Sequence, residues 1–455
     1  MVSPDPTNAS NLSSGDVPLA QLGNAPATDT TTLEDDIALL GFKVAVNGSL
    51  AKYNLVDQTE DAFMDATGID ATASTGEVRD AANYYAGTSA AATGGTITTY
   101  VDGANTYRVH SFLVDGTFVS ASTGSIDYLV VAGGGGAGST NAGDGGGGGA
   151  GGMLSGGGAT LTAGSHAITV GDGGAGSTTA ANGVNGGQSS IAATWVSVGG
   201  GGGSTSNTAA SAGGSGGGAG SNGSASGAGG SGTVGQGNAG GSGGSEGAGG
   251  GGAGVVGAGS GNGGNGIQNA YRTGANVYYA GGGGGGRDGG GTSGGAGGGG
   301  GGSPTSGNTQ GTDGLGGGGG GSGGVSHGKI GGSGIIVIRY VDGALSAPID
   351  MVLQSNSTTA ETAPTKGDIV MTYTNGAGTA TLNTDLTAEF SADNGSTWTS
   401  TTLVAQGSTG THLIVSAHDV TRTSTSGTAM KYRVKTLNQD AAKETRIQAV
   451  SLGWS

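Results

Sequence analysis

Short apolar segments that run directly into blocks of glycine are the feature of this sequence that most limits its possible folds. Three such segments read IDYLVVAGGGG from Ile126, TWVSVGGGGG from Thr194 and NVYYAGGGGGG from Asn276. Between Gly133 and Gly334, glycine occupies 91 of 202 positions. Glycine loses more conformational entropy on folding than any other residue, so an ordered block needs packing that only a missing Cβ allows. A conventional hydrophobic core therefore cannot run through this part of the chain.

Two structures are compatible with the glycine blocks. The first is a bundle of extended helices of the polyproline II type, whose three-residue repeat has no internal hydrogen bonds, so that neighbouring helices must satisfy one another's N–H and C=O groups. The second is a disordered, soluble tether. A flexible linker does not require Trp195, Tyr278 and Tyr279 at the entrances of its glycine runs. We therefore expect a glycine-rich domain over residues 105–341, in which short β-strands seed polyglycine helices.

The N-terminal third divides into an arm and a region that can fold. Residues 1–30 mix Pro, Ser, Thr, Asn and Gly without a period, which predicts an extended or disordered arm. Residues 31–104 contain apolar patterning, and we interpret them as an N-terminal attachment region. Acidic residues crowd residues 57–70, but they lack the spacing of a calcium-binding loop, which favours a solvated acidic face.

The start of this region carries two local signals. Thr31 and Glu34 have the spacing of a helix capping box. After an apolar run, Phe42, Val44 and Val46 alternate with other residues and lead into Asn47-Gly48. Because both central residues of a type I′ turn need positive φ, Asn-Gly after an alternating segment predicts a β-hairpin here.

Residues 348–455 show the period-two alternation of an antiparallel sheet. The alternating apolar positions are Leu386, Ala388 and Phe390, then Met430, Tyr432 and Val434, and finally Val450, Leu452 and Trp454. The first set is followed by the turn sequence Asp393-Asn394-Gly395. This pattern predicts a C-terminal antiparallel β-sandwich, and the chain as a whole is expected to be mainly β.

Two groups of side chains in the C-terminal domain allow alternative interpretations. Lys431, Arg433 and Lys435 share the outer face of one strand. A solvated face that discourages pairing at a sheet edge is one interpretation, and a contact surface for an anionic glycan is the other. Trp398 and Trp454 fall in the apolar register, which favours core packing over stacking on a sugar.

Charge and composition exclude several classes of protein. The 132 residues before Gly133 carry 4 basic and 16 acidic side chains, and the whole chain has a net charge of −16. This leaves no basic surface to neutralise phosphates, so nucleic acid is not an expected partner. The absence of cysteine removes disulfides and thiolate metal sites. The first residues lack the basic and apolar parts of a secretory signal, and no apolar run approaches the roughly 20 residues of a membrane helix.

No motif predicts catalysis, a cofactor or a metal. The segment Gly323–Lys329 matches the start of a phosphate-binding loop, but Ile330 stands where a hydroxyl side chain is needed. The five histidines show no metal-pair spacing, and they are His110, His166, His327, His412 and His418. Neither a nucleophile elbow nor a carboxylate pair can be identified. We therefore expect a protein that is not an enzyme, with no catalytic residue, cofactor or metal ligand.

The order of the strand segments in the glycine-rich part resembles a known family. Tyr107, Val109, His110 and Phe112 are followed by Gly116-Thr117-Phe118, by DYLVV from Asp127 entering glycine, by ITVGDGG and GGQSS, and by the closing GGSGIIVIRY. This order resembles the glycine-rich domain of bacteriophage tail-fibre and adhesin proteins, and the resemblance covers about residues 105–341. It implies that polyglycine helices pack as a sandwich and that the loops between them contact the host surface.

The C-terminal domain carries a second, independent resemblance. The stretches TDLTAEFSADNGSTWTSTTL and SGTAMKYRVKTLN, with the final VSLGW, resemble a terminal domain that recurs in phage tail proteins. Together the two resemblances imply a virion structural protein, either a phage tail fibre or an adhesin, that mediates attachment to the host cell surface. The alternative is a structural or decoration protein of the particle that makes no receptor contact.

The same resemblances imply where the protein acts and what it binds. Its place would be a tail appendage of the virion. The N-terminal region would bind other tail or baseplate proteins, because its net charge of −12 would be repelled by anionic polymers of a cell surface. The receptor would be a host surface glycan or an outer-membrane protein. We also expect a homo-oligomer, with a trimer as the favoured form, although no heptad repeat supports it.

Receptor contact is expected in the loops of residues 200–330 and in the C-terminal domain, rather than before residue 105. Loops between rigid polyglycine helices can vary in length without disturbing the core. Side chains of this region that can hydrogen-bond sugar hydroxyls or stack on a pyranose are Asn222, Asn262, Asn265, Thr305 and Asn308, with Tyr271 and Tyr278. Each of them alone is better explained as an ordinary solvent-exposed loop residue, so the region is predicted and individual receptor-binding residues are not.

Overall fold

The structure is a computed structural model that describes residues 31–50, 52–141, 143–223, 227–304, 306–324 and 327–455. The chain forms two compact units. Unit 1 combines the residues up to Ser89 with Pro348–Ser455, and unit 2 is Ala90–Ala347. The chain passes between the units within β5 (Ser89–Ala90) and β17 (Ala347–Pro348). Apart from one α-helix, the regular structure of the described residues is strand, which confirms the mainly β prediction.

The prediction of a β-hairpin with its turn at Asn47-Gly48 is wrong, because Thr31–Gly48 form a single helix, α1. Ala38, Phe42 and Ala45 are buried, at the spacing of one helical face. Ala38 packs against Val370 and Ile414 of the sheet beneath it. The apolar residues of this segment satisfy both a two-residue and a helical period, and contact with the sheet decides in favour of the helix. The expected capping box involves Thr31, whose side chain lies outside the described residues.

A glycine in the middle of α1 lies close to side chains of the sheet. A Cβ on Gly41 would lie 2.9 Å from the carboxyl carbon of Glu60 and 2.9 Å from the hydroxyl of Tyr53. Glu60 is fully buried. Glycine is unfavourable inside a helix by about 1 kcal/mol relative to alanine, and here it allows α1 to cover a buried carboxyl group.

Unit 1 is a sandwich of two antiparallel sheets. The strands of the first sheet are β1 (Lys52–Leu55), β2 (Gln58–Asp61), β26 (Glu444–Trp454), β20 (Lys366–Ala377), β24 (His412–Thr421) and β23 (Val404–Thr409), in that order, with β4 (Tyr85–Gly87) on β26 and β3 (Glu77–Arg79) on β4. The strands of the second sheet are β18 (Met351–Gln354), β25 (Ala429–Thr436), β21 (Leu386–Ser391) and β22 (Thr399–Ser400), with β19 (Thr358–Thr359) on β25. Both sheets contribute side chains to one hydrophobic core.

The sequence pattern of the C-terminal domain is confirmed strand by strand. The predicted apolar positions of β21, β25 and β26 are all buried in this core. The turn after β21 forms as predicted, with φ of 61° at Asn394 and 86° at Gly395. Alternation is a reliable signal here because each sheet buries one face and exposes the other.

The structure groups the N-terminal residues differently from the sequence-based division into 31–104 and 348–455. β2 pairs with β26 along its whole length, with Asp61 opposite Val450. Phe63, Ile69 and Tyr85 belong to the same core as the C-terminal strands. Residues 31–89 are therefore part of the sandwich. The acidic residues of 57–70 do not all form a solvated face either, since Glu60 and Asp61 are fully buried.

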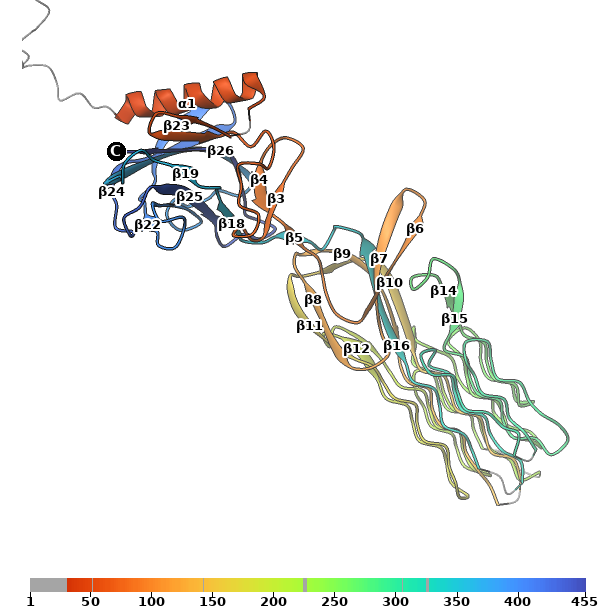
Figure 1. Ribbon diagram of the computed structural model, residues 1–455. Coiled ribbons are helices and arrows are strands. Elements are labelled where there is room, and N and C mark those ends of the chain that lie inside the picture. The colour runs from red at the N-terminus through yellow and green to blue at the C-terminus, as the bar shows by residue number, and fades with distance from the viewer. Residues whose placement is uncertain (1–30, 51, 142, 224–226, 305, 325–326) are drawn as a thin grey trace, which may run out of the picture. The chain divides into compact units, whose positions relative to one another are not determined.

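Unit 2 begins with two antiparallel sheets. The first sheet contains, in order, β10 (Met153–Leu161), β9 (Gly124–Val131), β16 (Ile335–Val341), β7 (Asn105–Phe112) and β6 (Thr96–Asp102). The second contains β13 (Trp195–Ser197), β12 (Ser189–Ile191), β11 (Gly164–Thr169) and β8 (Gly116–Ser120), and β14 (Ile267–Asn269) forms a hairpin with β15 (Val277–Tyr279). Most of these strands continue into glycine blocks, and Figure 1 shows the blocks as long, wavy segments beyond β12 and β16.

The glycine blocks form the predicted polyglycine helices, as the hydrogen bonds of residues 133–138 demonstrate. The N–H groups of Gly133 and Gly136 donate to Gly187 and Val184, those of Gly134 and Ala137 to Gly332 and Lys329, and those of Gly135 and Gly138 to Gly149 and Gly146. Residues three apart in this segment therefore donate to the same neighbouring segment. Each of the three neighbouring segments runs antiparallel to residues 133–138. This three-residue period is the repeat of a polyproline II helix, in which all hydrogen bonds go to neighbours.

Residues 145–152 form the central helix of the bundle, and its six neighbours all come from the same chain. The N–H groups donate to segments 316–322, 198–204 and 248–251, and the carbonyl groups accept from segments 132–138, 215–218 and 283–286. A Cβ on any of Gly146–Gly149 would come within 3.0 Å of a neighbouring backbone atom. The glycine content is thus a packing requirement, and a disordered tether is contradicted for the described residues.

Candidate functional site

The loops that connect the polyglycine helices gather at the end of the bundle away from the strands (Figure 1). We call this surface the loop end, and it comprises the described residues of 139–144, 178–182, 205–209, 220–223, 242–247, 287–292, 303–307 and 323–328. Bridges join these loops directly, from Asp144 to Ser221 and to Gly323, and from Ser303 to Ser322. Segments far apart in the sequence therefore form one continuous surface.

Side-chain hydrogen bonds fix the loops against one another. The Thr208 hydroxyl donates to Oδ1 of Asn182 over 2.9 Å. Ser221 donates to the carbonyl of Gly244 over 3.0 Å, and Ser206 donates to the carbonyl of Ser221 over 3.2 Å. A surface whose loops are linked in this way loses little conformational entropy when it binds a partner.

Few charged residues lie at the loop end. Arg287 and Glu246 form an ion pair with 2.9 Å between Nε and Oε2. Asp144 is buried, and burial, together with the nearby charges of Asp288 and Glu246, raises its pKa to about 6. Most of the remaining exposed side chains are Ser, Thr and Asn, so this surface offers neutral hydrogen-bonding groups.

Three of the four asparagines proposed from the sequence as sugar ligands have structural roles instead. Asn262 and Asn265 are exposed, but their Oδ1 atoms accept the backbone N–H groups of Ser293 and Ala296. Asn308 is buried and donates to the carbonyl groups of Gly320 and His327.

An asparagine side chain thus supplies a hydrogen-bond acceptor where an outer polyglycine helix lacks a neighbour. Asn222 is exposed at the loop end, as predicted. Thr305 lies outside the described residues.

The two tyrosines proposed for sugar stacking lie with the β14–β15 hairpin, near the strands and not at the loop end. Tyr278 is exposed. The ring of Tyr271 contacts the Arg339 guanidinium, which lies 4.1 Å from its centroid and 4.3 Å from that of Tyr107. Arg339 also pairs with Asp127 at 2.9 Å. Tyr271 is therefore already stacked on a cation of its own chain.

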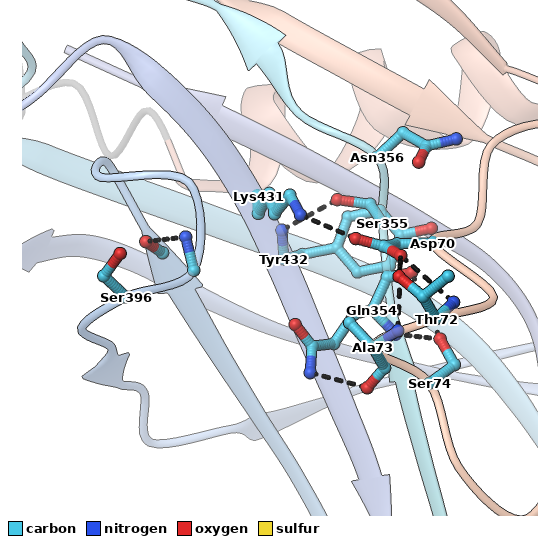
Figure 2. Close-up of polar contacts among 12 residues, drawn as sticks. Asp70, Thr72, Ala73, Ser74, Gln354, Ser355, Asn356, Ser396, Lys431 and Tyr432 are labelled. Carbon is cyan, nitrogen blue, oxygen red and sulfur yellow. Dashed lines mark hydrogen bonds and ion pairs between the residues drawn. The ribbon is translucent and has the colours of Figure 1, made fainter.

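The basic strand β25 is neither a solvated face nor a free cationic surface. Lys431 is buried and donates to Asp70 over 2.8 Å, as Figure 2 shows. Hydrogen bonds from Lys431 and from Thr72 lower the pKa of Asp70 to about 2. In the same view Gln354 bonds to Ala73 and to Ser74, which fixes the loop that carries Asp70 on the sheet. Both interpretations offered by the sequence are wrong for Lys431.

The other two cations of β25 are also neutralised within unit 1. Arg433 donates to Glu389 over 2.6 Å, and Lys435 lies 2.8 Å from the same carboxylate. Burial acts to raise the pKa of Glu389, but hydrogen bonds from Lys435 and Arg433 lower it overall. The guanidinium of Arg433 stacks 4.1 Å from the ring centroid of Trp398. The prediction of core packing is therefore wrong for Trp398, which is partly exposed, while Trp454 is buried in the core as predicted.

The histidines lie in separate surroundings. His110 is buried between the Gly94 carbonyl and the Tyr340 hydroxyl, and burial lowers its pKa. His166 contacts the Thr162 carbonyl, and His412 contacts the Tyr84 hydroxyl at 2.6 Å. His327 is exposed at the loop end. His418 is surrounded by carboxylates of residues distant in sequence.

The segment that resembles the start of a phosphate loop does not have the surroundings of one. Lys329, the last residue of the matching segment Gly323–Lys329, lies in a polyglycine helix, where its N–H donates to the Gly320 carbonyl. The chain then enters strand β16 rather than a helix. A phosphate loop needs a helix N-terminus at this point, so the motif match is accidental.

The model of a family described as a glycine-rich domain matches residues 113–341. The chain belongs to the glycine-rich domain family. The matched segment begins between β7 and β8 and ends at the last residue of β16, so the glycine-rich domain includes every polyglycine helix.

No curated protein matches the chain. Among the residues that the structure describes, no helix is long and apolar enough to cross a membrane.

Proposed function

We propose that this protein is a binding protein of a bacteriophage tail, a tail fibre or adhesin, and that the loop end of its glycine-rich domain contacts the host cell surface. The observation that supports this proposal best is the division of the bundle into a rigid hydrogen-bonded body and a set of loops at one end. Such a body tolerates changes in the loops, because the hydrogen bonds that hold it lie between the helices. The order of strands and glycine blocks, which resembles phage adhesins, supports the assignment to a virion.

The chemistry of the loop end favours a neutral, hydroxyl-bearing ligand. Its exposed residues are mostly Ser, Thr and Asn, and the basic residue Arg287 is already paired with Glu246. Hydroxyl and amide groups recognise sugar hydroxyls through directional hydrogen bonds. We therefore propose a surface glycan, or the polar outer loops of an outer-membrane protein, as the receptor.

The proposal assigns binding and not catalysis to the chain, and it places the protein on a tail appendage of the virion. Other tail or baseplate proteins would bind the N-terminal arm and unit 1, which include the segment of highest negative charge. No role in nucleic-acid binding or in cofactor chemistry is proposed.

Self-association has support from one exposed surface. Leu33, Ile37, Leu40 and Val44 are all exposed on α1, at successive spacings of four, three and four residues. This is the a/d spacing of two heptads, so the interpretation that no heptad supports self-association is wrong for this segment. We propose that a second copy of the chain covers the stripe. The glycine-rich bundle does not require partner chains, since its central helix obtains all six neighbours from one chain.

The host-contact proposal is tested with the full chain, because a fragment cut near residue 105 would remove β1–β4 from the sandwich. Labelled protein is mixed with susceptible cells, and the bound fraction and the inhibition of infection are measured. The variant Asn141→Glu/Ser245→Glu places charge on exposed loop-end residues, and Val234→Glu/Asn276→Glu places it on exposed residues near the strands.

We expect the loop-end variant to lose at least about tenfold in binding, which corresponds to roughly 1.4 kcal/mol, while the other variant binds like the wild type. Loss of binding only in the variant near the strands would contradict the proposed orientation. Absence of binding by the wild-type chain would favour a decoration protein.

A further inference from the structure

Three residues of unit 1 bring metal-ligating atoms together at the edge where α1 meets the first sheet. They are Glu34 of α1, Asp368 of β20 and His418 of β24, and one ligand atom of each lies within 4.8 Å of the other two. Nδ1 of His418 is 2.9 Å from Oε2 of Glu34 and 3.8 Å from Oδ1 of Asp368. One imidazole and two carboxylates from separate elements therefore face a common point.

The orientation of the His418 ring is fixed from its other side. Nε2 lies 3.0 Å from Oδ1 of Asp35, whose side chain is almost fully buried. Histidines that bind metals usually donate their second ring N–H to a carboxylate, which fixes the tautomer and directs the other nitrogen at the ion. Asp35 holds His418 in this arrangement, and Asp368 is held in turn by the backbone N–H of Asp419.

Among the described residues, Nδ1 of His418 makes no hydrogen bond of good geometry, although it lies 2.9 Å from Oε2 of Glu34. The side chain is only 7% exposed, so water does not readily compensate this atom. If Nε2 carries the proton donated to Asp35, Nδ1 presents a lone pair beside two carboxylates, which is unfavourable unless a cation lies between them. The geometry thus needs positive charge at this point, either as a bound ion or as a second proton on the ring.

The point is accessible to an ion from solution. Glu34, Asp368 and His418 line a pocket of about 280 Å³ that also includes Val56 and Trp454. The Glu34 side chain is 39% exposed and forms the outer wall. Three protein ligands and an open side match a metal site that retains water molecules.

We propose that Glu34, Asp368 and His418 bind one divalent transition-metal ion, and that the ion fastens α1 to strands β20 and β24. An imidazole nitrogen selects such ions over Mg²⁺ and Ca²⁺, which prefer oxygen ligands throughout. Sequence spacing shows no trace of the site because its ligands come from both ends of the chain. The consequence is structural: α1 also carries the apolar stripe of Leu33, Ile37, Leu40 and Val44, so the ion stabilises the helix that presents it.

The test uses the full chain without a histidine tag, after treatment with EDTA and dialysis. Zn²⁺ is titrated into the protein in a calorimeter, with Mg²⁺ and Ca²⁺ as comparison ions, and Co²⁺ absorption reports the ligand set. His418→Gln and Asp368→Asn remove ligands, and Asp35→Asn changes only the group that orients the ring. His412→Gln is the matched control, because that histidine contacts Tyr84 and no carboxylate in the described structure.

We expect one Zn²⁺ to bind per chain, with at least 100-fold weaker binding in His418→Gln and a 10- to 100-fold loss, as is typical of changes to orienting groups, in Asp35→Asn. His412→Gln should bind like the wild type. Binding of Zn²⁺ that is unchanged in His418→Gln, or no binding by the wild type, would overturn the proposal.

A second measurement needs no variant, so it still tests the proposal if a variant does not fold. It is the hydrogen exchange of residues 31–48 in the wild-type chain, measured with and without Zn²⁺. Zn²⁺ should slow exchange in this segment, because binding to the folded state stabilises it. Equal exchange with and without Zn²⁺ would contradict a metal that fastens α1 to the sheet.

Discussion

Replacing Gly148 by alanine tests whether missing Cβ atoms hold the glycine-rich domain together. Gly148 lies in the central polyglycine helix and donates to the Gly319 carbonyl over 2.9 Å. A Cβ at this position would lie 2.7 Å from the carbonyl carbon of Gly135, and closer still to its oxygen. The contact is with backbone, so no rotation of a side chain can relieve it. Segments 132–138 and 145–152 must therefore move apart.

The cost follows from the bonds between these two segments. Moving them apart lengthens the hydrogen bonds from Ala132 to Gly152, from Gly135 to Gly149 and from Gly138 to Gly146, which are now 3.0, 2.8 and 2.9 Å long. Each is worth about 0.5–1.5 kcal/mol net, and overpacking of a tight interior adds about 1–3 kcal/mol. We expect Gly148→Ala to destabilise the bundle by about 2.5–7.5 kcal/mol in total.

The assay is hydrogen exchange measured by mass spectrometry on peptides of the full chain. A loss of this size should speed exchange within residues 132–152 by roughly 10²- to 10⁵-fold, since each 1.4 kcal/mol is a factor of ten. Gly289→Ala is the control, because a Cβ on that exposed glycine would meet nothing within 4 Å. Equal exchange in the two variants would refute the argument that close backbone packing is what requires glycine here.

Three further predictions concern unit 1. Burial raises the pKa of Glu60 to about 8, against an ordinary value of 4.5. Between these pH values the folded protein therefore holds a proton that the unfolded chain has lost. The free energy of unfolding should fall by about 3.5 kcal/mol as the pH rises from 5 to 8. Urea titrations across this range should show a smaller pH dependence in Glu60→Gln, and equal slopes would contradict the assignment.

Asp70→Asn should lower the free energy of unfolding by about 3 kcal/mol, because it leaves Lys431 buried without a counter-charge. In urea titrations the exposed Asp57→Asn serves as control, and similar midpoints for both variants would speak against a structural ion pair. If copies of the chain associate through α1, Leu40→Asp should convert the oligomer to a monomer in sedimentation experiments. Val101→Asp, at an exposed site on β6, should leave the oligomer unchanged. A wild-type chain that is already monomeric at micromolar concentration would rule out this interface.

The sequence by itself determined the parts of the fold that depend on local patterns. Leu386, Ala388 and Phe390 alternate because one face of β21 is buried, and Asn394-Gly395 supplies the positive φ values of the following turn. The glycine blocks specify polyglycine helices for the same kind of reason. A helix with three residues per turn and neighbours on all sides has no room for a Cβ, so its composition reveals its packing.

The tertiary structure decided every feature that depends on contacts between distant residues. The segment of α1 has an apolar pattern that suits a strand as well as a helix, and the sheet surface beneath Ala38 and Phe42 selects the helix. The sequence predicts that Glu60 and Lys431 are exposed, but both are buried. Local spacing does not reveal which face of a strand another element will cover. For the same reason the sequence suggests that Asn262 and Asn265 are free to bind a ligand. In the structure their Oδ1 atoms accept backbone N–H groups of a polyglycine helix that lies 31 residues further along the chain. Local spacing specifies the period of an element, whereas the burial and pairing of a side chain depend on the element that packs against it.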